Sequence, residues 1–292
     1  MKKRTFVVFF SILLSVFCLG GFVACPPAAA DFESLLVSWN DGPTKTKIVN
    51  FVDNVINTVD PSDRIAVFDN DGTLWTEKPD YIQVSFIEYY RGINPSVNLE
   101  TPDCSTEPQI TPEQYKQEAR QFLDTQNHPY LGFQYIQLTF KPMVELVNYL
   151  QSNDFKVYIS SGGGTDFIRS FAEDAYGIPP ENIIGTTTKA EYCDPENDGT
   201  FVLLKTKILV EPINDGKRKP VGIDRYIGKK PIMAVGNSSG DLQMLDYTDD
   251  HIGPALMMLL HHDDTRECPY AELAQIDCPY DDPVFDVAND RR

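Results

Sequence analysis

The segment Ile65–Trp75, which reads IAVFDNDGTLW, constrains the fold and chemistry of this chain more than any other. Four mostly apolar residues run directly into Asp69, and Asp71 follows two positions later, before Gly72 turns the backbone. A buried strand that ends in two acids places both carboxylates in the crevice at the carboxyl edge of a sheet. Ligands bind in that crevice in open α/β folds. We therefore predict a functional site at Asp69 and Asp71.

Two other structures are compatible with parts of this segment. Asn-Asp-Gly at 70–72 is also a strong signal for a tight turn between strands, and alone it does not decide between a turn and a catalytic loop. A calcium-binding loop that began at Asp69 would need glycine at its sixth position, where this chain has Leu74. The rest of the chain therefore has to decide.

Along the chain, short apolar runs alternate with amphipathic segments. Strands are predicted at 65–69, 155–160, 183–184, 231–235 and 252–260, and helices at 33–59, 142–152, 165–176, 220–227 and from 242 onward. The segment 186–213 is predicted to form a hairpin that turns at 197–199. Strands that alternate with helices predict an α/β fold, a doubly wound, Rossmann-like parallel sheet with helices on both faces.

Residues 76–140 interrupt this alternation with a polar and aromatic segment. Thr111 followed by Pro112 predicts the start of a helix, with threonine as its cap. We expect a small helical cap domain at 76–140, inserted between the two parts of the α/β core at 31–75 and 141–292.

The first thirty residues have the pattern of an export signal. Lys2, Lys3 and Arg4 precede a long apolar run, and small residues follow it. Cleavage after Ala30 is one outcome, and lipidation at Cys25 is another, because the residues before Cys25 resemble a bacterial lipobox. An uncleaved membrane anchor is the third. All three predict an exported protein, periplasmic or secreted, that contacts the membrane only through this segment or through a lipid at Cys25.

The charge of the chain restricts its partners. Residues 1–30 carry three positive and no negative charges, so their removal takes the formal charge from −18 to −21. A chain this acidic should bind neither nucleic acid through its phosphates nor an anionic membrane surface. A small phosphorylated substrate is still compatible with it, provided that a local cation holds the phosphate.

Four of the six cysteines lie outside the leader, at Cys104, Cys193, Cys268 and Cys278. An exported protein can form disulfides between them, but the sequence does not choose among the three pairings. A zinc site is disfavoured because the close Cys pairs of zinc modules are absent from the sequence.

Polar residues follow two more of the predicted strands. Ser161 and three glycines follow one strand, Asn237 and Asp241 follow another, and Lys219 lies between them in the sequence. With Asp69–Thr73, this order resembles the four motifs of the haloacid dehalogenase superfamily, over about residues 60–260. The Ser-Gly-Gly sequence and the late hairpin are most similar to its phosphoserine phosphatase-like branch.

The resemblance implies a Mg²⁺-dependent phosphatase that hydrolyses small phosphomonoesters. Asp69 would attack phosphorus and form an aspartyl-phosphate, and Asp71 would act as general acid and then as general base. The phosphate would be bound by Ser161, Gly162 and Lys219. The Mg²⁺ ligands would come from Asp69, the backbone carbonyl of Asp71, Asn237 and Asp241.

Several points stay open at this stage. The family has aspartate where this chain has Asn237, so the metal would bind more weakly or Asp241 would take a direct role. Lys217 competes with Lys219 for the lysine of the third motif, and Asp246 offers a second register for the last motif.

Trp75 and Glu77 could line a substrate pocket or pack the hinge of the insert, whereas the four histidines, 128, 251, 261 and 262, are expected to be structural. A binding protein without turnover and a carbon–halogen hydrolase are the alternative functions, the second disfavoured by Asp71.

Overall fold

Five parallel strands form the central sheet in a computed structural model that describes residues 36–95 and 110–262. All of these residues belong to one compact unit of the chain. The strand order is β3-β2-β1-β6-β7. The strands are β1 (Ile65–Phe68), β2 (Lys156–Gly164), β3 (Ile183–Thr186), β6 (Met233–Gly236) and β7 (Leu256–Leu259). The predicted parallel α/β sheet is confirmed.

Strand β1 lies at the centre of the sheet and positions the site. It pairs with β2 on one side and with β6 on the other, so that Val67 is in register with Tyr158 and with Ala234. The chain moves outward from β1 through β2 to β3, and later returns to the other side of β1 with β6 and β7. The carboxyl ends of β1 and β6 therefore flank a topological switch point, the place where such sheets bind ligands.

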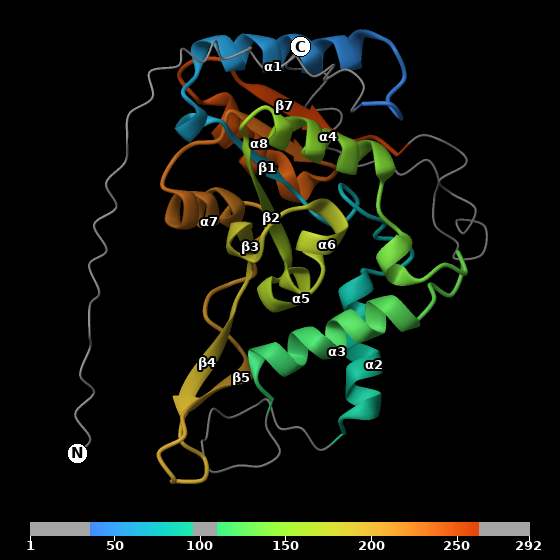
Figure 1. Ribbon diagram of the computed structural model, residues 1–292, viewed down its shortest axis with the longest axis vertical. Helices are drawn as coiled ribbons and strands as arrows, with labels where there is room; N and C mark the ends of the chain where they lie inside the picture. Colours follow the sequence, from blue (N-terminus) through green and yellow to red (C-terminus); the bar gives the residue numbers. More distant parts are fainter. Residues whose placement is uncertain (1–35, 96–109, 263–292) are drawn as a thin grey trace, which may run out of the picture. The chain divides into compact units, whose positions relative to one another are not determined.

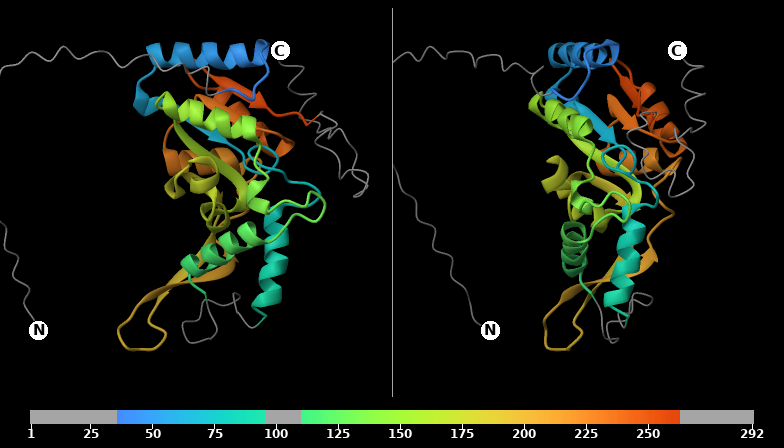
Figure 2. Two further views of the ribbon diagram at one scale, coloured as in Figure 1. Left: turned by 45° about the vertical axis from the view of Figure 1, so that its right-hand side comes forward. Right: turned by 90° about the vertical axis from the view of Figure 1, so that its right-hand side faces the viewer.

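Helices cover both faces of the sheet (Figures 1 and 2). Ala66 and Phe68 of β1 join one apolar cluster, with side chains of α1, α4, α5 and α6, whereas Ile65 and Val67 join a second cluster with α7 and α8. This alternation is the period-two pattern of a strand buried on both faces. The helices are α1 (Pro43–Thr58), α4 (Lys141–Ser152), α5 (Thr165–Arg169), α6 (Ala172–Tyr176), α7 (Arg218–Ile227) and α8 (Leu242–Asp249).

Two helices lie in the segment predicted as an insert, α2 (Ile82–Ile93) and α3 (Pro112–Thr125). Thr111 caps α3 as predicted, in a capping box with Gln114. The aromatic rings of the two helices pack on one another and on Phe167 of α5, so their apolar cluster is continuous with that of the sheet. The short 3₁₀ helices are η2 (Pro61–Asp63), η3 (Tyr135–Gln137), η4 (Pro180–Asn182) and η5 (Ser239–Asp241).

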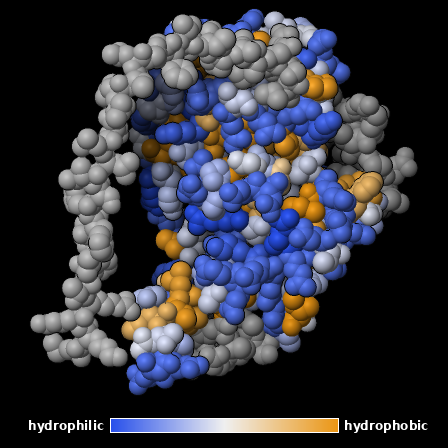
Figure 3. All heavy atoms as spheres, in the orientation of Figure 1, coloured by the Kyte–Doolittle hydropathy of each residue, from blue (hydrophilic) through white to orange (hydrophobic). Residues whose placement is uncertain are grey.

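The predicted hairpin is formed by β4 (Thr188–Cys193) and β5 (Val202–Leu209), which pair antiparallel. Asn197 and Gly199 have positive φ angles of 53° and 88° in its turn. Hydrophobic side chains gather on its surface, and Tyr192 is 70% exposed (Figure 3). Cys193 forms a disulfide. The other cysteines considered for pairing, Cys104, Cys268 and Cys278, lie outside the described residues.

Several element boundaries differ from those expected. The helix predicted at 33–59 corresponds to α1, which begins only at Pro43. The predicted helix 165–176 is two short helices, because Phe171 leaves the helical conformation and stacks its ring on Trp75 at 4.3 Å. Strand β2 continues past Ser161 to Gly164, which pairs with Thr186 after an irregularity in register. The last strand, predicted at 252–260, is the shorter β7 at Leu256–Leu259. None of the helices within 36–95 and 110–262 is long and apolar enough to cross a membrane. The predicted export segment lies outside these ranges.

Candidate active site

The backbone turns sharply as soon as β1 ends. Asp69 extends the sheet by one hydrogen bond, from its backbone nitrogen to the carbonyl of Val235 at 2.9 Å. The carbonyl of Asn70 then accepts from the backbone nitrogen of Leu74 at 2.8 Å, and Gly72 adopts a φ of 73°. The predicted tight turn and the predicted site at the strand end are therefore one short loop. This loop carries the carboxylates of both Asp69 and Asp71.

Lys219 is buried between two of the predicted acids. Its Nζ lies 2.6 Å from Oδ1 of Asp69 and 2.6 Å from Oδ1 of Asp241. Burial opposes the charge of the ammonium, but the adjacent Asp241 and Asp69 more than offset this and raise the pKa of Lys219. Burial and Asp241 also raise the pKa of Asp69 well above its usual value, against the influence of Lys219. Lys217, the competing lysine, is exposed.

Asp241 organises the loop that follows β6. Its Oδ2 accepts hydrogen bonds from the backbone nitrogens of Asn237 at 3.0 Å and Ser238 at 3.1 Å, while its Oδ1 is paired with Lys219. Both carboxylate oxygens therefore already bind donors of the protein. Its role as a Mg²⁺ ligand stays a prediction, and the contacts show it as the residue that positions Lys219 and Asn237. The alternative acid, Asp246, is partly exposed in α8.

Trp75 holds the side chain of Asp71, a contact that sequence reasoning missed. The indole Nε1 donates to Oδ1 of Asp71 at 2.7 Å. Trp75 is fully buried, and it packs on Phe167 and Phe171. Burial raises the pKa of Asp71, although the Trp75 hydrogen bond lowers it in part. The spacing of Trp75, four residues after Asp71, is the only signal that could have suggested this contact.

Asn237 faces two side chains of the loop that follows β1. Its Oδ1 accepts a hydrogen bond from Oγ1 of Thr73 at 3.3 Å, and the same hydroxyl lies 3.5 Å from Oδ2 of Asp69. Its Nδ2 donates to Oε1 of Glu77 at 3.2 Å. Glu77 is 9% exposed, and burial raises the pKa of its carboxyl. Glu77 thus belongs to the site, whereas Trp75 packs beneath it.

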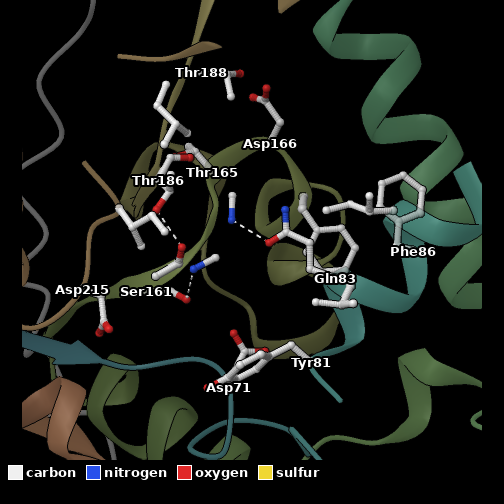
Figure 4. Close-up of a pocket in the computed structure, with 18 of the residues that line it drawn as sticks. Asp71, Tyr81, Gln83, Phe86, Ser161, Thr165, Asp166, Thr186, Thr188 and Asp215 are labelled. Carbon is white, nitrogen blue, oxygen red and sulfur yellow. Dashed lines mark hydrogen bonds between the residues drawn. The ribbon is translucent and has the colours of Figure 1, made fainter. Parts of the chain in front are cut away.

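Ser161 and the glycines after it form a further edge of the site. Ser161 is 1% exposed, and its Oγ accepts a hydrogen bond from the backbone nitrogen of Gly163 at 3.0 Å. The backbone nitrogen of Gly164 donates to Oε1 of Gln83, which projects from α2 (Figure 4) at 2.8 Å. Gln83 therefore ties the insert to the glycine segment, a contact without any sequence motif.

These side chains open onto a cavity of about 1070 Å³. In Figure 4 Asp71 lies toward one end of it and Thr188 toward the other, with Ser161 between them. The predicted site residues that line it are Asp69, Asp71, Ser161, Gly162 and Lys219. Asn237 and Asp241 are not part of the lining, and both are almost fully buried. The insert contributes Tyr81, Phe86 and Tyr115 to the walls, and the hairpin contributes Thr188 and Lys205.

The donor atoms of the site suit Mg²⁺, which prefers a few carboxylate and carbonyl oxygens and keeps several waters. The carboxylate of Asp69 and the amide oxygen of Asn237 meet at the Thr73 hydroxyl. Lys219 supplies one positive charge, whereas the site holds the buried carboxyls of Asp69 and Asp241 and the half-buried carboxyl of Asp71. A divalent cation would offset the remaining charge. In the described ranges no three His, Cys, Asp or Glu side chains form a metal-binding group.

Comparisons with known proteins add little to this. No family model and no curated protein matches the chain. A conserved functionally unknown protein from Anaerococcus prevotii is 14% identical, with a TM-score of 0.46, and 79% of this chain and 89% of that one are covered. A phosphoserine phosphohydrolase-like protein from Francisella tularensis is 19% identical, with a TM-score of 0.37 and coverages of 63% and 82%. Cytosolic 5'-nucleotidase IIIB, in a structure with cytidine bound, is 13% identical, with a TM-score of 0.41 and coverages of 78% and 82%.

At these identities and TM-scores the similarities imply nothing about the activity of this chain. The function proposed next therefore rests on the residues of the site.

Proposed function

We propose that this protein is a Mg²⁺-dependent phosphatase that hydrolyses small-molecule phosphomonoesters through an aspartyl-phosphate. The observation that carries the proposal is the buried ion pair of Lys219 with Asp69 and Asp241, beside a second acid, Asp71, at the carboxyl end of the central strand. In this proposal Asp69 is the nucleophile, Lys219 the cation and Asp71 the proton donor, and all three line the cavity.

Asp69 is the nucleophile in this proposal. One carboxylate oxygen forms a bond to phosphorus as the bond from phosphorus to the ester oxygen breaks, which leaves the phosphoryl group on Asp69. Asp71 donates a proton to the departing oxygen and later removes one from the water that hydrolyses the aspartyl-phosphate. Hydrolysis releases phosphate and regenerates both carboxyl groups.

The other residues bind and orient the phosphoryl group. Ser161 Oγ already accepts from Gly163, so its own hydrogen can be donated to a phosphoryl oxygen. Lys219, paired with Asp69, offsets negative charge as the phosphate approaches. Mg²⁺, held by Asp69, the carbonyl of Asp71 and Asn237, would supply the charge neutralisation that brings two anions together.

The size of the cavity favours an organic leaving group over a bare phosphate. At about 1070 Å³ it exceeds the volume of a phosphoryl group, and it continues from the acids to the aromatic side chains of the insert. Sites of this size and lining bind small molecules. The insert and the hairpin therefore select the leaving group, whereas the strand ends perform the chemistry.

Hydrolysis of an aryl phosphate by the purified protein tests the proposal. We expect turnover with Mg²⁺ and none after EDTA treatment. Asp69→Asn should abolish turnover, whereas Asp194→Asn, a change in the hairpin turn, should leave it intact. Full activity of Asp69→Asn, or activity unaffected by EDTA, would contradict the mechanism.

A binding function without turnover is the second candidate, and the neutral side chain of Asn237 favours it. Fold alone does not imply catalysis. Such a protein would bind phosphate or beryllofluoride together with Mg²⁺, yet hydrolyse no member of a phosphoester library. Turnover of any phosphoester that is lost with Asp69→Asn would exclude this candidate.

We also propose that the protein acts outside the cytoplasm, as a periplasmic or secreted enzyme. The disulfide of Cys193 supports this, because disulfides persist in oxidising compartments. Cell fractionation would test it, and Cys25→Ser would distinguish a lipid anchor from cleavage of the leader. Recovery of the protein in the cytoplasmic fraction, with its cysteines reduced, would contradict the proposal.

A further inference from the structure

The side chains of Asn237 and Glu77 meet on the glycine that follows Asp71. They are 1% and 9% exposed, and Nδ2 of Asn237 lies 3.2 Å from Oε1 of Glu77. A Cβ atom at Gly72 would lie 2.0 Å from Nδ2 of Asn237 and 2.8 Å from Cδ of Glu77. The two groups are therefore packed against the backbone of the loop that carries both predicted catalytic acids.

The contact sets which way the amide of Asn237 faces. An ionised carboxylate accepts hydrogen bonds and donates none, so the amide nitrogen has to face Glu77. The amide oxygen then faces the opposite way, where it accepts from the Thr73 hydroxyl beside Asp69. Glu77 thus turns the one oxygen of Asn237 that can bind a cation toward Asp69.

Glu77 also places a negative charge beside Asn237, whose own side chain is neutral. An amide ligand is neutral, and the carboxylate of Glu77 lies one hydrogen bond away from it. Glu77 lines the same cavity as Asp69 and Asp71. Because the attraction between a cation and a carboxylate falls only with the inverse of distance, a charge one side chain removed still favours cation binding.

We infer that Glu77 is a positioning residue of the Mg²⁺ site, which orients the amide of Asn237 and supplies the negative charge that this amide lacks. The inference rests on the proposed function. The ligand class is a divalent cation with a preference for oxygen donors.

The inference is tested by moving the negative charge from residue 77 to residue 237 and measuring cation binding. The test therefore does not depend on catalytic activity. Binding of Mn²⁺ would be followed by electron paramagnetic resonance, and binding of Mg²⁺ by calorimetry. Glu77→Gln keeps the acceptor oxygen and removes the charge, and should weaken binding by about 10- to 100-fold, the usual effect of losing a partner of a metal ligand. Adding Asn237→Asp to Glu77→Gln moves the charge onto residue 237 and should restore most of the affinity.

A third variant keeps the test decisive if Glu77→Gln folds poorly. Asn237→Asp alone sets two carboxylates against each other, so the cation-free protein should lose thermal stability and gain more from Mg²⁺ than the parent does. Glu113→Gln, at an exposed position of α3, is the matched control and should change nothing.

The possible results distinguish a failure of this inference from a failure of the proposed function on which it rests. If the parent binds Mn²⁺ and Asp69→Asn abolishes binding, but Glu77→Gln binds as tightly as the parent, only the role of Glu77 is overturned. It is also overturned if the double variant binds no better than Glu77→Gln, or if Asn237→Asp gains no extra stability from Mg²⁺. A folded parent that binds neither cation overturns both proposals.

Discussion

Nζ of Lys219 lies 2.6 Å from Oδ1 of Asp69, although 150 positions separate the two residues in the chain. Asp69 follows the central strand, and Lys219 is the second residue of α7, which packs on the sheet. The same ammonium also binds Asp241 at 2.6 Å. The ion pair thus joins the loops after β1 and β6 to the start of α7.

Replacement of Lys219 should destabilise the protein as well as inactivate it. Lys219→Met keeps the length of the side chain, but it leaves Asp69 and Asp241 buried without their cation. Removing one partner of a buried ion pair costs about 3–5 kcal/mol, and a rise in the carboxyl pKa values would recover part of this. Urea denaturation should therefore show a loss of about 3 kcal/mol in the free energy of unfolding.

Lys229→Met is the control for this variant, since Lys229 pairs with Asp63 on the surface. Pairs of that kind contribute little to stability, so the unfolding curve should barely move. If the two variants unfold at the same urea concentration, Lys219 is not the buried counter-charge described above.

Trp75→Phe should lower kcat through the position of Asp71. Phenylalanine retains a ring that can stack on Phe171 but loses the Nε1 donor that holds Asp71. A shift of about 1 Å in a catalytic group can cost about 100-fold in rate, so we expect a loss of kcat approaching that size. Steady-state kinetics would measure it.

Trp39→Phe provides the comparison, because Trp39 also donates its indole hydrogen, to the carbonyl of Pro142 at 2.7 Å, outside the cavity lining. This variant should lose about 1 kcal/mol of stability and no activity. Equal kinetic effects of the two substitutions would show that the Trp75 contact with Asp71 has no special role.

Gly72→Ala should disrupt the site by direct overlap. The new Cβ would lie 2.0 Å from Asn237, and the backbone there has a φ of 73°. Gly228→Ala is the control. Gly228 has a similar positive φ of 71°, but a Cβ atom there would have nothing within 4 Å. The control should lose about 1–2 kcal/mol, the cost of alanine in a left-handed conformation.

The difference between these two variants isolates the overlap at the site. Thermal denaturation should show Gly72→Ala as the less stable of the pair, and calorimetry should show its Mg²⁺ binding reduced. Equal stabilities and unchanged Mg²⁺ binding would mean that the loop after Asp71 adapts without affecting Asn237.

His128 should make the fold sensitive to mild acid. Its Nδ1 accepts from the backbone nitrogens of Tyr130 at 3.3 Å and Leu131 at 3.1 Å, so the proton of the neutral ring lies on Nε2, 2.9 Å from the carbonyl of Lys78. Burial lowers the pKa of His128. The unfolded chain, with a histidine pKa of about 6.5, then binds the proton more tightly than the folded one.

Stability should consequently fall as the pH drops below about 6.5, until the lower pKa of the folded state is passed. His128→Gln cannot take up this proton, so its unfolding free energy should depend less on pH over the same interval. Urea denaturation at several pH values would compare the two proteins. Parallel pH curves for parent and variant would contradict the assignment.

The residues that meet at strand ends could be predicted from the sequence, for a simple physical reason. A parallel sheet brings the carboxyl ends of its strands to one edge, so apolar runs followed by polar residues identify Asp69, Ser161 and Asn237 without any coordinates. The apolar run of β1 and the helix cap at Thr111 are equally local signals, and both agree with the structure.

Contacts that depend on side-chain direction could not be predicted in this way. The indole of Trp75 donates to Asp71 and also stacks on Phe171, which lies between α5 and α6, and nothing local to Trp75 requires either contact. Gln83 and Glu77 belong to the segment predicted as an insert. They reach the site only because that segment packs on the sheet domain, which local sequence signals do not reveal. Tertiary packing overrode local propensity at 165–176 for the same reason.

The central claim is that Asp69 receives the phosphoryl group, and acid-quenched protein would test this most directly. After brief incubation with a ³²P-labelled phosphomonoester and Mg²⁺, peptide mapping should find the label on Asp69. Label should be absent from Asp69→Asn and should disappear from the parent when excess unlabelled ester is added. Label on any other residue, or sustained hydrolysis by the Asp69→Asn variant, would contradict the account.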